Sequence, residues 1–368
     1  KYFNGLNALR FFAAFLVLIH HLEQIRFKYG MFNLKEFSLF NNGGLAVSFF
    51  FVLSGFLISY TLISEKKTFG TINVDKFYVR RILRIWPLYF FLVIIGVFFL
   101  PYLISIFNIN YIMPYKYSDV ILYYVFFSPF LVNIFFGNHL LEPLWSIGVE
   151  EIFYIIWAPL AKYLNFSILK IALFIIILKF LILQIALNLH NHQLFLKLLR
   201  ILSFESMSIG AIGAYYVYNL KTDLSNHILF SKKAQFVIFS LIIFRFLGFY
   251  LLRDYYVFNE NQLFFTNLFF NLLFLWLIIN VSLNKNSFLK LNNRILNLLG
   301  DISYGIYMYH MIAIFFVVLI LKNFLNDIHP FLSSFIIYSL VLSITILVSY
   351  LSKTYFEDYF LKMKSNFK

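Results

Sequence analysis

Long runs of apolar side chains constrain the fold of this chain more than any other feature of its sequence. Clear examples run from Ile168 to Leu189 and from Phe236 to Leu252. The hydrocarbon core of a bilayer is about 30 Å thick, and a helix of about 20 mostly apolar residues crosses it. Lipid offers the backbone no hydrogen-bond partners, so each run must satisfy its own amide groups as a helix. The sequence therefore predicts an all-α fold, a polytopic bundle of transmembrane helices.

Composition supports this prediction and excludes other classes of protein. Of 368 residues, 62% are hydrophobic and 12% are charged, and that charged share is about half of what is usual in soluble domains. The net charge is +14, but Lys and Arg stand at the ends of the apolar runs, so we expect no nucleic acid partner. The chain has no cysteine, which excludes disulfides, thiolate metal sites and a cysteine nucleophile. We expect no metal.

The apolar runs and the basic loops together predict the topology. No linker or large polar block divides the runs, so residues 1–368 are predicted to form a single integral-membrane domain with no appended soluble domain. Loops 64–84, 220–234 and 283–300 and the C-terminal tail are basic, which predicts that they are cytoplasmic. Run 121–136 is short and polar, and is interpreted as a re-entrant or interfacial segment. About ten spans with both termini cytoplasmic are then predicted. These spans lie near residues 8–22, 45–63, 85–105, 145–164, 167–189, 201–219, 235–252, 262–282, 302–322 and 331–352.

Ionisable side chains inside such runs are functional candidates, because burying a charge in a bilayer costs a few kcal/mol or more. Arg10 and His21 lie eleven residues apart, which places both on one face of a helix, about 16 Å apart. His20 points about 100° away. His21 is a candidate general base, because a neutral imidazole can take a proton from a hydroxyl. Alternatively, Arg10 anchors the helix at the interface and the histidines mark its end.

Small and cationic side chains distinguish two further segments. Ser54 and Gly55 belong to a stretch of small residues, for which close helix packing is the main interpretation, although the same residues could admit a thin ligand. Arg81 and Arg84 share one face at a helix start, with Arg80 beside them. Guanidinium groups fork onto phosphate oxygens, so the arginines are candidates for a phosphate clamp. An anchor for anionic lipid is the alternative.

Two carboxylates and a late histidine complete the buried ionisable groups. Glu150 and Glu151 lie inside run 145–164, where one of them should face the protein interior. That carboxylate is either functional or the buried partner of an Arg or His. His310 lies about eight residues into a late run, and as a lone histidine it could simply hydrogen-bond to a neighbouring helix.

These segments, in this order, resemble acyltransferase family 3, the membrane O-acyltransferases that modify surface polysaccharides and other acceptors. The likeness covers nearly the whole chain, from Gly5 to beyond His310. The family motifs are an Arg and a His separated by ten residues, a Phe-rich stretch, Arg-x-x-Arg, Trp-Ser-x-x-x-Glu and a late Ser-Tyr-x-x-Tyr…His pattern. The matching positions are Arg10 and His21, Phe50 to Leu57, Arg81 and Arg84, Trp145, Ser146 and Glu150, and Ser303, Tyr304, Tyr307 and His310.

The resemblance implies transfer of an acyl group, expected to be acetyl, from acetyl-CoA to a hydroxyl of a carbohydrate such as a surface polysaccharide or its lipid-linked precursor. On this hypothesis Arg81, Arg84 and Arg80 hold the donor phosphates. The pantetheine arm passes Arg10, Ser54 and Gly55. His21 deprotonates the acceptor and Glu150 orients His21. Ser146, Asn7 and Tyr304 are candidate oxyanion donors, and a covalent acyl-histidine route is the alternative to direct transfer.

One position departs from the common family pattern. The family often has an acidic residue three positions before the first Arg, and this chain has Asn7 there. An Asn side chain can still hydrogen-bond, but it cannot balance the charge of Arg10, which argues against an ion pair at that position.

The expected partners follow from the same hypothesis. We expect no tightly bound cofactor, with acyl-CoA and a carbohydrate acceptor as substrates, in the lipid bilayer of a bacterial inner membrane. A homo-oligomer is compatible with the sequence. The main rival is a polytopic transporter, flippase or polymerase of polysaccharide precursors. Such proteins usually have paired repeats or broken helices in matching halves. A second rival is an unrelated membrane acyltransferase with His310 as its base.

Overall fold

The regular structure of the described residues is helical, and no strand occurs among them. The structure is a computed structural model, and it describes residues 3–106, 111, 114–138, 140–164, 167–189, 192–220, 223–248, 258–325 and 328–367. Eight helices within these ranges are long and apolar enough to cross a membrane, which confirms the predicted all-α membrane fold. They are Leu6–Lys28 (α1), Gly43–Phe69 (α2), Val74–Ile106 (α3, η2 and α4), Leu144–Tyr163 (α7), Ile168–Leu187 (α8), Glu260–Leu283 (α13), Ser303–Leu325 (α15) and Pro330–Met363 (α16, η5 and α17).

The other two predicted spans form shorter helices. Runs 201–219 and 235–252 contain α10 (Phe204–Asn219) and α11 (Lys232–Leu247), each of 16 residues. Residues 249–252 of the second run lie outside the described part of the chain. A helix of 16 residues is shorter than the roughly 20 that cross a bilayer. The total number of crossings and the cytoplasmic side of the termini stay predictions.

The weak run 121–136 folds as two short helices. These are α5 (Tyr117–Val125) and α6 (Pro129–Phe135), of nine and seven residues. Tyr124 and Phe130 are buried, and the Tyr89 hydroxyl donates to the carbonyl oxygen of Tyr124 at 2.8 Å. Neither helix is long enough to cross a bilayer, as expected for a re-entrant or interfacial segment packed against protein.

The chain packs as two compact units, each assembled from separate stretches of sequence. The prediction of a single domain over residues 1–368 stays a prediction. The first unit contains Lys1–Gln24, Asn33–Ile72 and Leu160–Ser303, and the second contains Ile25–Phe32, Asn73–Pro159 and Tyr304–Lys368. The first unit also includes α9 (Gln193–Ile201) and α14 (Arg294–Asp301), with short 3-10 turns at Ser38–Asn41, Leu224–Asn226 and Ile228–Phe230. In the second unit the long helices divide into α3 (Val74–Ile94), η2 (Ile95–Phe99), α4 (Leu100–Ile106), α16 (Pro330–Ser352), η5 (Lys353–Glu357), α17 (Asp358–Met363) and η6 (Lys364–Phe367).

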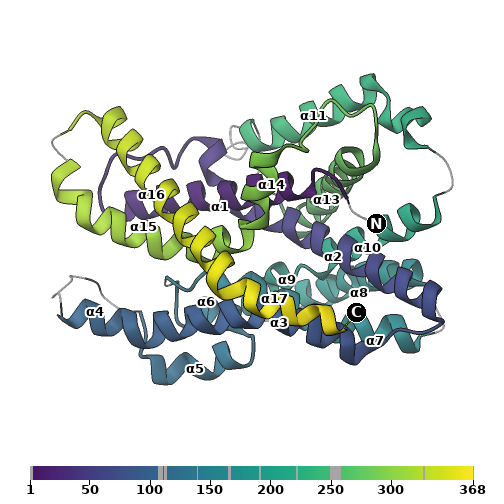
Figure 1. The fold of residues 1–368 in the computed structure, drawn as a ribbon, viewed down its shortest axis with the longest axis horizontal. Helices are drawn as coiled ribbons and strands as arrows, with labels where there is room; N and C mark the ends of the chain where they lie inside the picture. Colours follow the sequence, from purple (N-terminus) through teal and green to yellow (C-terminus); the bar gives the residue numbers. More distant parts are fainter. Residues whose placement is uncertain are drawn as a thin grey trace. The chain divides into compact units, whose positions relative to one another are not determined.

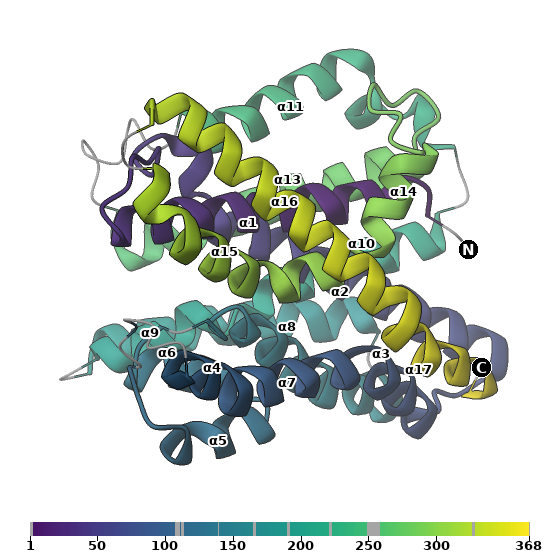
Figure 2. The ribbon, with the colours of Figure 1, turned by 60° about the vertical axis from the view of Figure 1, so that its left-hand side comes forward.

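Glycine allows α2 and α10 to approach closely in the first unit, where both figures draw them side by side (Figures 1 and 2). A Cβ at Gly55 would lie 2.0 Å from the carbonyl oxygen of Met207. A Cβ at Gly210 would lie 2.0 Å from the carbonyl oxygen of Val52. Close backbone contact of this kind is how small residues hold membrane helices together. Gly55 therefore serves helix packing, the main interpretation of its sequence stretch.

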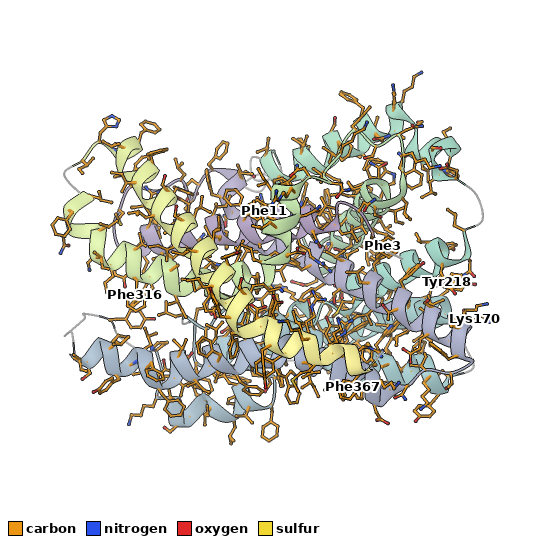
Figure 3. The ribbon with its side chains drawn as sticks, in the orientation of Figure 1. Phe3, Phe11, Lys170, Tyr218, Phe316 and Phe367 are labelled. Atoms are coloured by element: carbon orange, nitrogen blue, oxygen red, sulfur yellow. The ribbon has the colours of Figure 1, made fainter. Side chains whose placement is uncertain are left out.

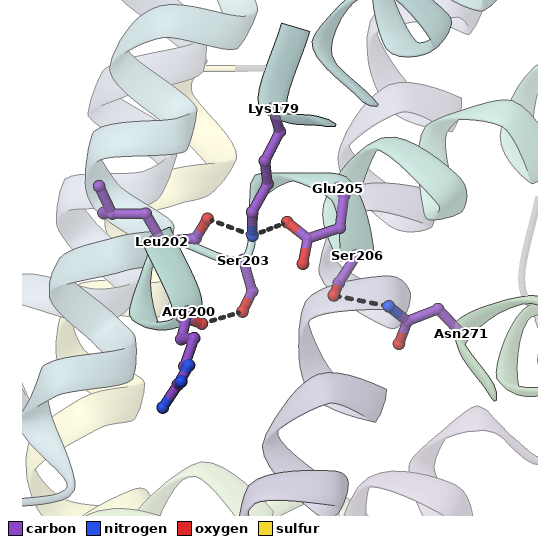
Figure 4. Close-up of polar contacts among 7 residues, drawn as sticks. All are labelled: Lys179, Arg200, Leu202, Ser203, Glu205, Ser206 and Asn271. Carbon is purple, nitrogen blue, oxygen red and sulfur yellow. Dashed lines mark hydrogen bonds and ion pairs between the residues drawn. The ribbon is translucent and has the colours of Figure 1, made fainter. Parts of the chain in front are cut away.

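A buried ion pair joins α8 to α10 in the first unit (Figure 4). Lys179, near the middle of α8, donates to the carboxylate of Glu205 and, at 3.0 Å, to the carbonyl oxygen of Leu202. Leu202 lies in the break between α9 and α10, where carbonyl groups lack helical partners. Next to the pair, Asn271 of α13 donates to Ser206 at 2.8 Å. The sequence alone does not predict these contacts, because a single Lys within a long apolar run forms no motif.

Replacing Gly55 by Ala should lower the thermal unfolding midpoint of the purified protein in detergent. The added methyl group would meet the backbone of α10, and overpacking of this kind costs about 1–3 kcal/mol. Gly44→Ala is the matched control, because Gly44 lies in the same helix and a Cβ there would have no atom within 4 Å. Equal midpoints for Gly55→Ala and Gly44→Ala would contradict the packing role.

Lys179→Ala should destabilise the protein far more than Lys285→Ala in the same unfolding assay. Removing Lys179 leaves the buried Glu205 carboxylate without its cation, a loss of about 3–5 kcal/mol. Lys285 pairs with Asp223 at 2.7 Å on the surface, where water screens the attraction. If the unfolding midpoint fell equally in the two variants, burial of the pair would not make Lys179 more important for stability than Lys285.

Candidate active site

The first helix carries the candidate base. It runs unbroken from Leu6 to Lys28, so Arg10 and His21 share one face as their spacing predicts, and both are half-buried. The Nδ1–H group of His20 donates to the carbonyl oxygen of Phe40 at 3.1 Å. Its ring occupies the space beside Gly43, where a Cβ would lie 2.4 Å from His20 Cδ2. His20 thus ties α1 to the start of α2, and the role of His21 as the base stays a prediction.

A hydrogen-bonded chain leads from Arg10 to a carboxylate on another helix of the same unit. Arg10 Nη1 donates to Asn7 Oδ1 at 3.2 Å, and Asn7 Nδ2 donates to Asp301 Oδ1 at 2.7 Å. Asp301 is the last residue of α14. The acidic group that the sequence lacks at Asn7 is therefore supplied from α14. Asp301 is not predicted from the sequence, because no local pattern connects it to the first helix.

The candidate donor channel beside Ser54 and Gly55 stays a prediction. Gly55 packs against α10, as described above. Ser54 is half-buried one residue earlier. A position of Ser54 beside a pantetheine arm stays a prediction.

The three arginines lie in the first turns of α3, in the second unit. Arg81 is half-buried, and its Cζ lies 5.7 Å from the ring centroid of Phe77 and 5.9 Å from that of Tyr154. The Nε atom of Arg81 is buried without a hydrogen-bond partner among the described residues. Arg84 is exposed. Arg80 Nη1 donates to the carbonyl oxygen of Phe367 at 3.0 Å, and Phe367 is labelled in Figure 3.

A fourth cation joins these arginines from the C-terminal segment. The helix α17 lies along α3 in both ribbon views (Figures 1 and 2), and Lys364 follows it as the first residue of η6. Burial, and then the charges of Arg84, Arg81 and Arg80, lower the pKa of Lys364 to about 8. Four cations that repel one another form a site that a phosphate group would stabilise. In the sequence the basic tail predicts only topology, so Lys364 is not among the predicted site residues.

The two adjacent carboxylates of α7 have different environments. Glu151 is only 5% exposed and accepts a hydrogen bond from Trp86 Nε1 at 3.1 Å. Glu150 is half-buried and accepts from the Tyr154 hydroxyl one turn further along the helix. Glu151 is thus the inward-facing member that the sequence predicted, and Glu150 is the more accessible one.

The Trp-Ser-x-x-x-Glu and Ser-Tyr-x-x-Tyr…His segments meet in the second unit. The Ser146 hydroxyl of α7 lies 2.8 Å from the Tyr307 hydroxyl of α15, which donates to the carbonyl oxygen of Pro143 at 3.1 Å. His310 is fully buried, and its Nδ1–H group donates to the carbonyl oxygen of Tyr307 at 2.6 Å. In the neutral ring its Nε2 atom is then the basic nitrogen. These contacts connect two motifs that lie about 160 residues apart in the sequence.

Tyr304 and Trp145 are the remaining candidates of the second unit. The Tyr304 hydroxyl donates to the carbonyl oxygen of Ile85 at 3.0 Å, which joins α15 to α3. Trp145 is half-buried beside Ser146. Because His21 belongs to the first unit and Glu150 to the second, their predicted pairing stays a prediction. Within the described ranges, no cluster of three or more His, Asp or Glu side chains could hold a metal ion.

Fold and motifs together define a helical integral-membrane protein with buried ionisable groups, and comparisons with known proteins identify its class. An acyltransferase domain family matches residues 3–353. The chain therefore belongs to this family of acyltransferases. That result favours the acyltransferase interpretation over a transporter, flippase or polymerase.

Two curated relatives illustrate the similarity. Peptidoglycan O-acetyltransferase OatA from Listeria monocytogenes is 26% identical over 161 residues, which are 43% of this chain and 24% of that protein. O-acetyltransferase OatA from Staphylococcus aureus is 27% identical over 337 residues, 86% of this chain and 51% of that protein. The chain thus spans about half the length of the staphylococcal relative. No solved structure matches the chain.

Proposed function

We propose that this protein is an O-acetyltransferase of the bacterial plasma membrane, which transfers an acetyl group from acetyl-CoA to a hydroxyl of a cell-wall or surface polysaccharide. The family match over residues 3–353 carries the proposal. The names of the relatives support acetyl as the transferred group, and one of them supports peptidoglycan as the acceptor.

Donor recognition is assigned to the cations of the second unit. Arg80, Arg81, Arg84 and Lys364 would bind the phosphates of acetyl-CoA from the cytoplasm. Arginine suits this task because its planar fork donates two parallel hydrogen bonds to a phosphate. The buried Arg81 Nε without a described protein partner and the mutual repulsion at Lys364 both support an anionic ligand. The pantetheine arm would pass Arg10 and Ser54 in the first unit.

His21 would act as the general base of a direct transfer. Its imidazole takes the proton of the acceptor hydroxyl while the hydroxyl oxygen forms a bond to the thioester carbonyl carbon. When the tetrahedral intermediate collapses, the carbon–sulfur bond breaks and the imidazolium returns the proton to the CoA thiolate. Glu150 would stabilise the imidazolium, as a carboxylate does in other histidine-base enzymes. This scheme releases CoA and the acetyl ester and leaves the enzyme unchanged.

Ser146, Asn7 and Tyr304 would be the candidate oxyanion donors, and each now donates to a protein acceptor. The Asn7 amide donates to Asp301, and the Tyr304 hydroxyl donates to the Ile85 carbonyl oxygen. The Ser146 hydroxyl is buried, lies 2.8 Å from the Tyr307 hydroxyl and donates to the carbonyl oxygen of Pro143 at 3.3 Å. Whichever group serves would have to exchange its present acceptor for the developing oxyanion.

His21→Ala should abolish acetyl transfer, with kcat lowered about 10²- to 10⁴-fold by loss of the general base. The measurement is acetyl-CoA turnover by purified protein in liposomes with a glycan acceptor, alongside the thermal unfolding midpoint. His20→Ala is the neighbouring control, and it should lower the midpoint while transfer continues. If His310→Gln abolished transfer in a folded protein while His21→Ala left it intact, His310 would replace His21 as the base.

The kcat/KM for acetyl-CoA should fall about tenfold as the pH rises through about 8. Lys364 has its pKa lowered to about 8, so its ammonium group is charged below that pH and its contact to phosphate is lost above it. Lys364→Arg keeps the charge and should remove the fall. Acetylated pantetheine, which has no phosphate, is the control substrate. An equal alkaline fall with that substrate would exclude Lys364 as the cause.

A further inference from the structure

We propose that Asp301 is a positioning residue for Arg10, with the Asn7 side chain as the relay between them. The relay rests on contacts within the first unit. Only its activity readout rests on the proposed function, because Arg10 is expected to contact the donor.

The chemistry of the three groups fixes the direction of the relay. An ionised carboxylate only accepts hydrogen bonds, so the amide nitrogen of Asn7 must face Asp301. The amide oxygen then faces the other way, toward Arg10, whose guanidinium only donates. The two distances, 2.7 Å at Asp301 and 3.2 Å at Arg10, agree with this order. If position 301 did not carry a group that only accepts hydrogen bonds, the Asn7 amide could rotate by about 180°. It would then present its nitrogen, instead of its oxygen, to Arg10.

Local packing places Asp301 at the start of α1. A Cβ at Gly300 would lie 2.2 Å from the carbonyl oxygen of Asn7, so glycine is what lets α14 touch the first turn of α1. Ser303 holds this corner by donating to the carbonyl oxygen of Gly300 at 2.6 Å. A carboxylate at this place also interacts favourably with the positive end of the α1 dipole.

The relay connects Arg10 to a negative group through the Asn7 amide. Arg10 is half-buried in a membrane helix, where an ionised side chain needs a partner. Asp301 is exposed, so direct charge attraction through water is weak. Its effect is expected to come mainly from orienting the Asn7 amide, and hence from where the Arg10 guanidinium points.

The test is a cycle of three variants, Asp301→Asn, Asn7→Asp and the double variant, assayed for acetyl-CoA turnover in liposomes. Asp301→Asn should lower kcat/KM about tenfold, because the new amide no longer dictates how Asn7 turns. Asn7→Asp should also lower it, because two carboxylates would face each other. In the double variant the carboxylate at position 7 pairs directly with Arg10. The amide at position 301 donates a hydrogen bond to that same carboxylate. Its kcat/KM should return to within about threefold of wild type.

Two further readouts keep the outcome decisive. Asp223→Asn removes an exposed carboxylate from the same unit and should leave kcat/KM unchanged. Thermal midpoints are measured for all variants. Rescue of kcat/KM in the double variant supports the relay, and additive losses overturn it. If wild type does not turn over acetyl-CoA, the proposed donor is wrong, and the relay is judged from the same cycle of midpoints, where rescue supports it and additivity overturns it.

Discussion

Every polar group that a helix carries into lipid needs a partner, and the internal contacts of both units depend on this requirement. The backbone meets it by folding into helices. The side chains meet it by pairing across helices, because leaving one unpaired costs free energy. Lys179 pairs with Glu205 in the first unit, and Trp86 donates to Glu151 in the second. Helix contacts are therefore specified by these pairs as well as by apolar packing.

Small residues decide where such pairs can form. Gly55 and Gly210 bring the backbones of α2 and α10 together, and Gly300 brings α14 onto the first turn of α1. Gly148 does the same in the second unit, where a Cβ would lie 2.5 Å from the carbonyl oxygen of Phe127. Each close approach fixes the distance between two helix backbones. A neighbouring hydroxyl, amide or carboxylate must span that distance to contact the other helix. Packing and polar chemistry are thus linked through the same positions.

The candidate functional groups divide between the two units. The first unit contains the imidazole of His21 and the chain from Arg10 to Asp301. The second contains the cationic cluster around Lys364, the carboxylates of α7 and the linked hydroxyls of Ser146 and Tyr307. Proton transfer and phosphate binding need different surroundings, since a base must stay neutral at working pH while a phosphate site needs concentrated positive charge.

The sequence by itself determined that the chain is helical and membrane-embedded, because a bilayer leaves a long apolar run no other stable form. Ordered motifs also indicated the family and most candidate residues, including His21, Glu150 and the arginines of α3. Only the tertiary structure showed that α10 and α11 are 16 residues long and that Gly55 packs against α10. It alone joined Ser146 to Tyr307, Asn7 to Asp301 and Lys364 to the arginines. The physical reason is that hydropathy fixes which residues enter the membrane, whereas side-chain contacts between distant segments depend on how closely particular helices pack.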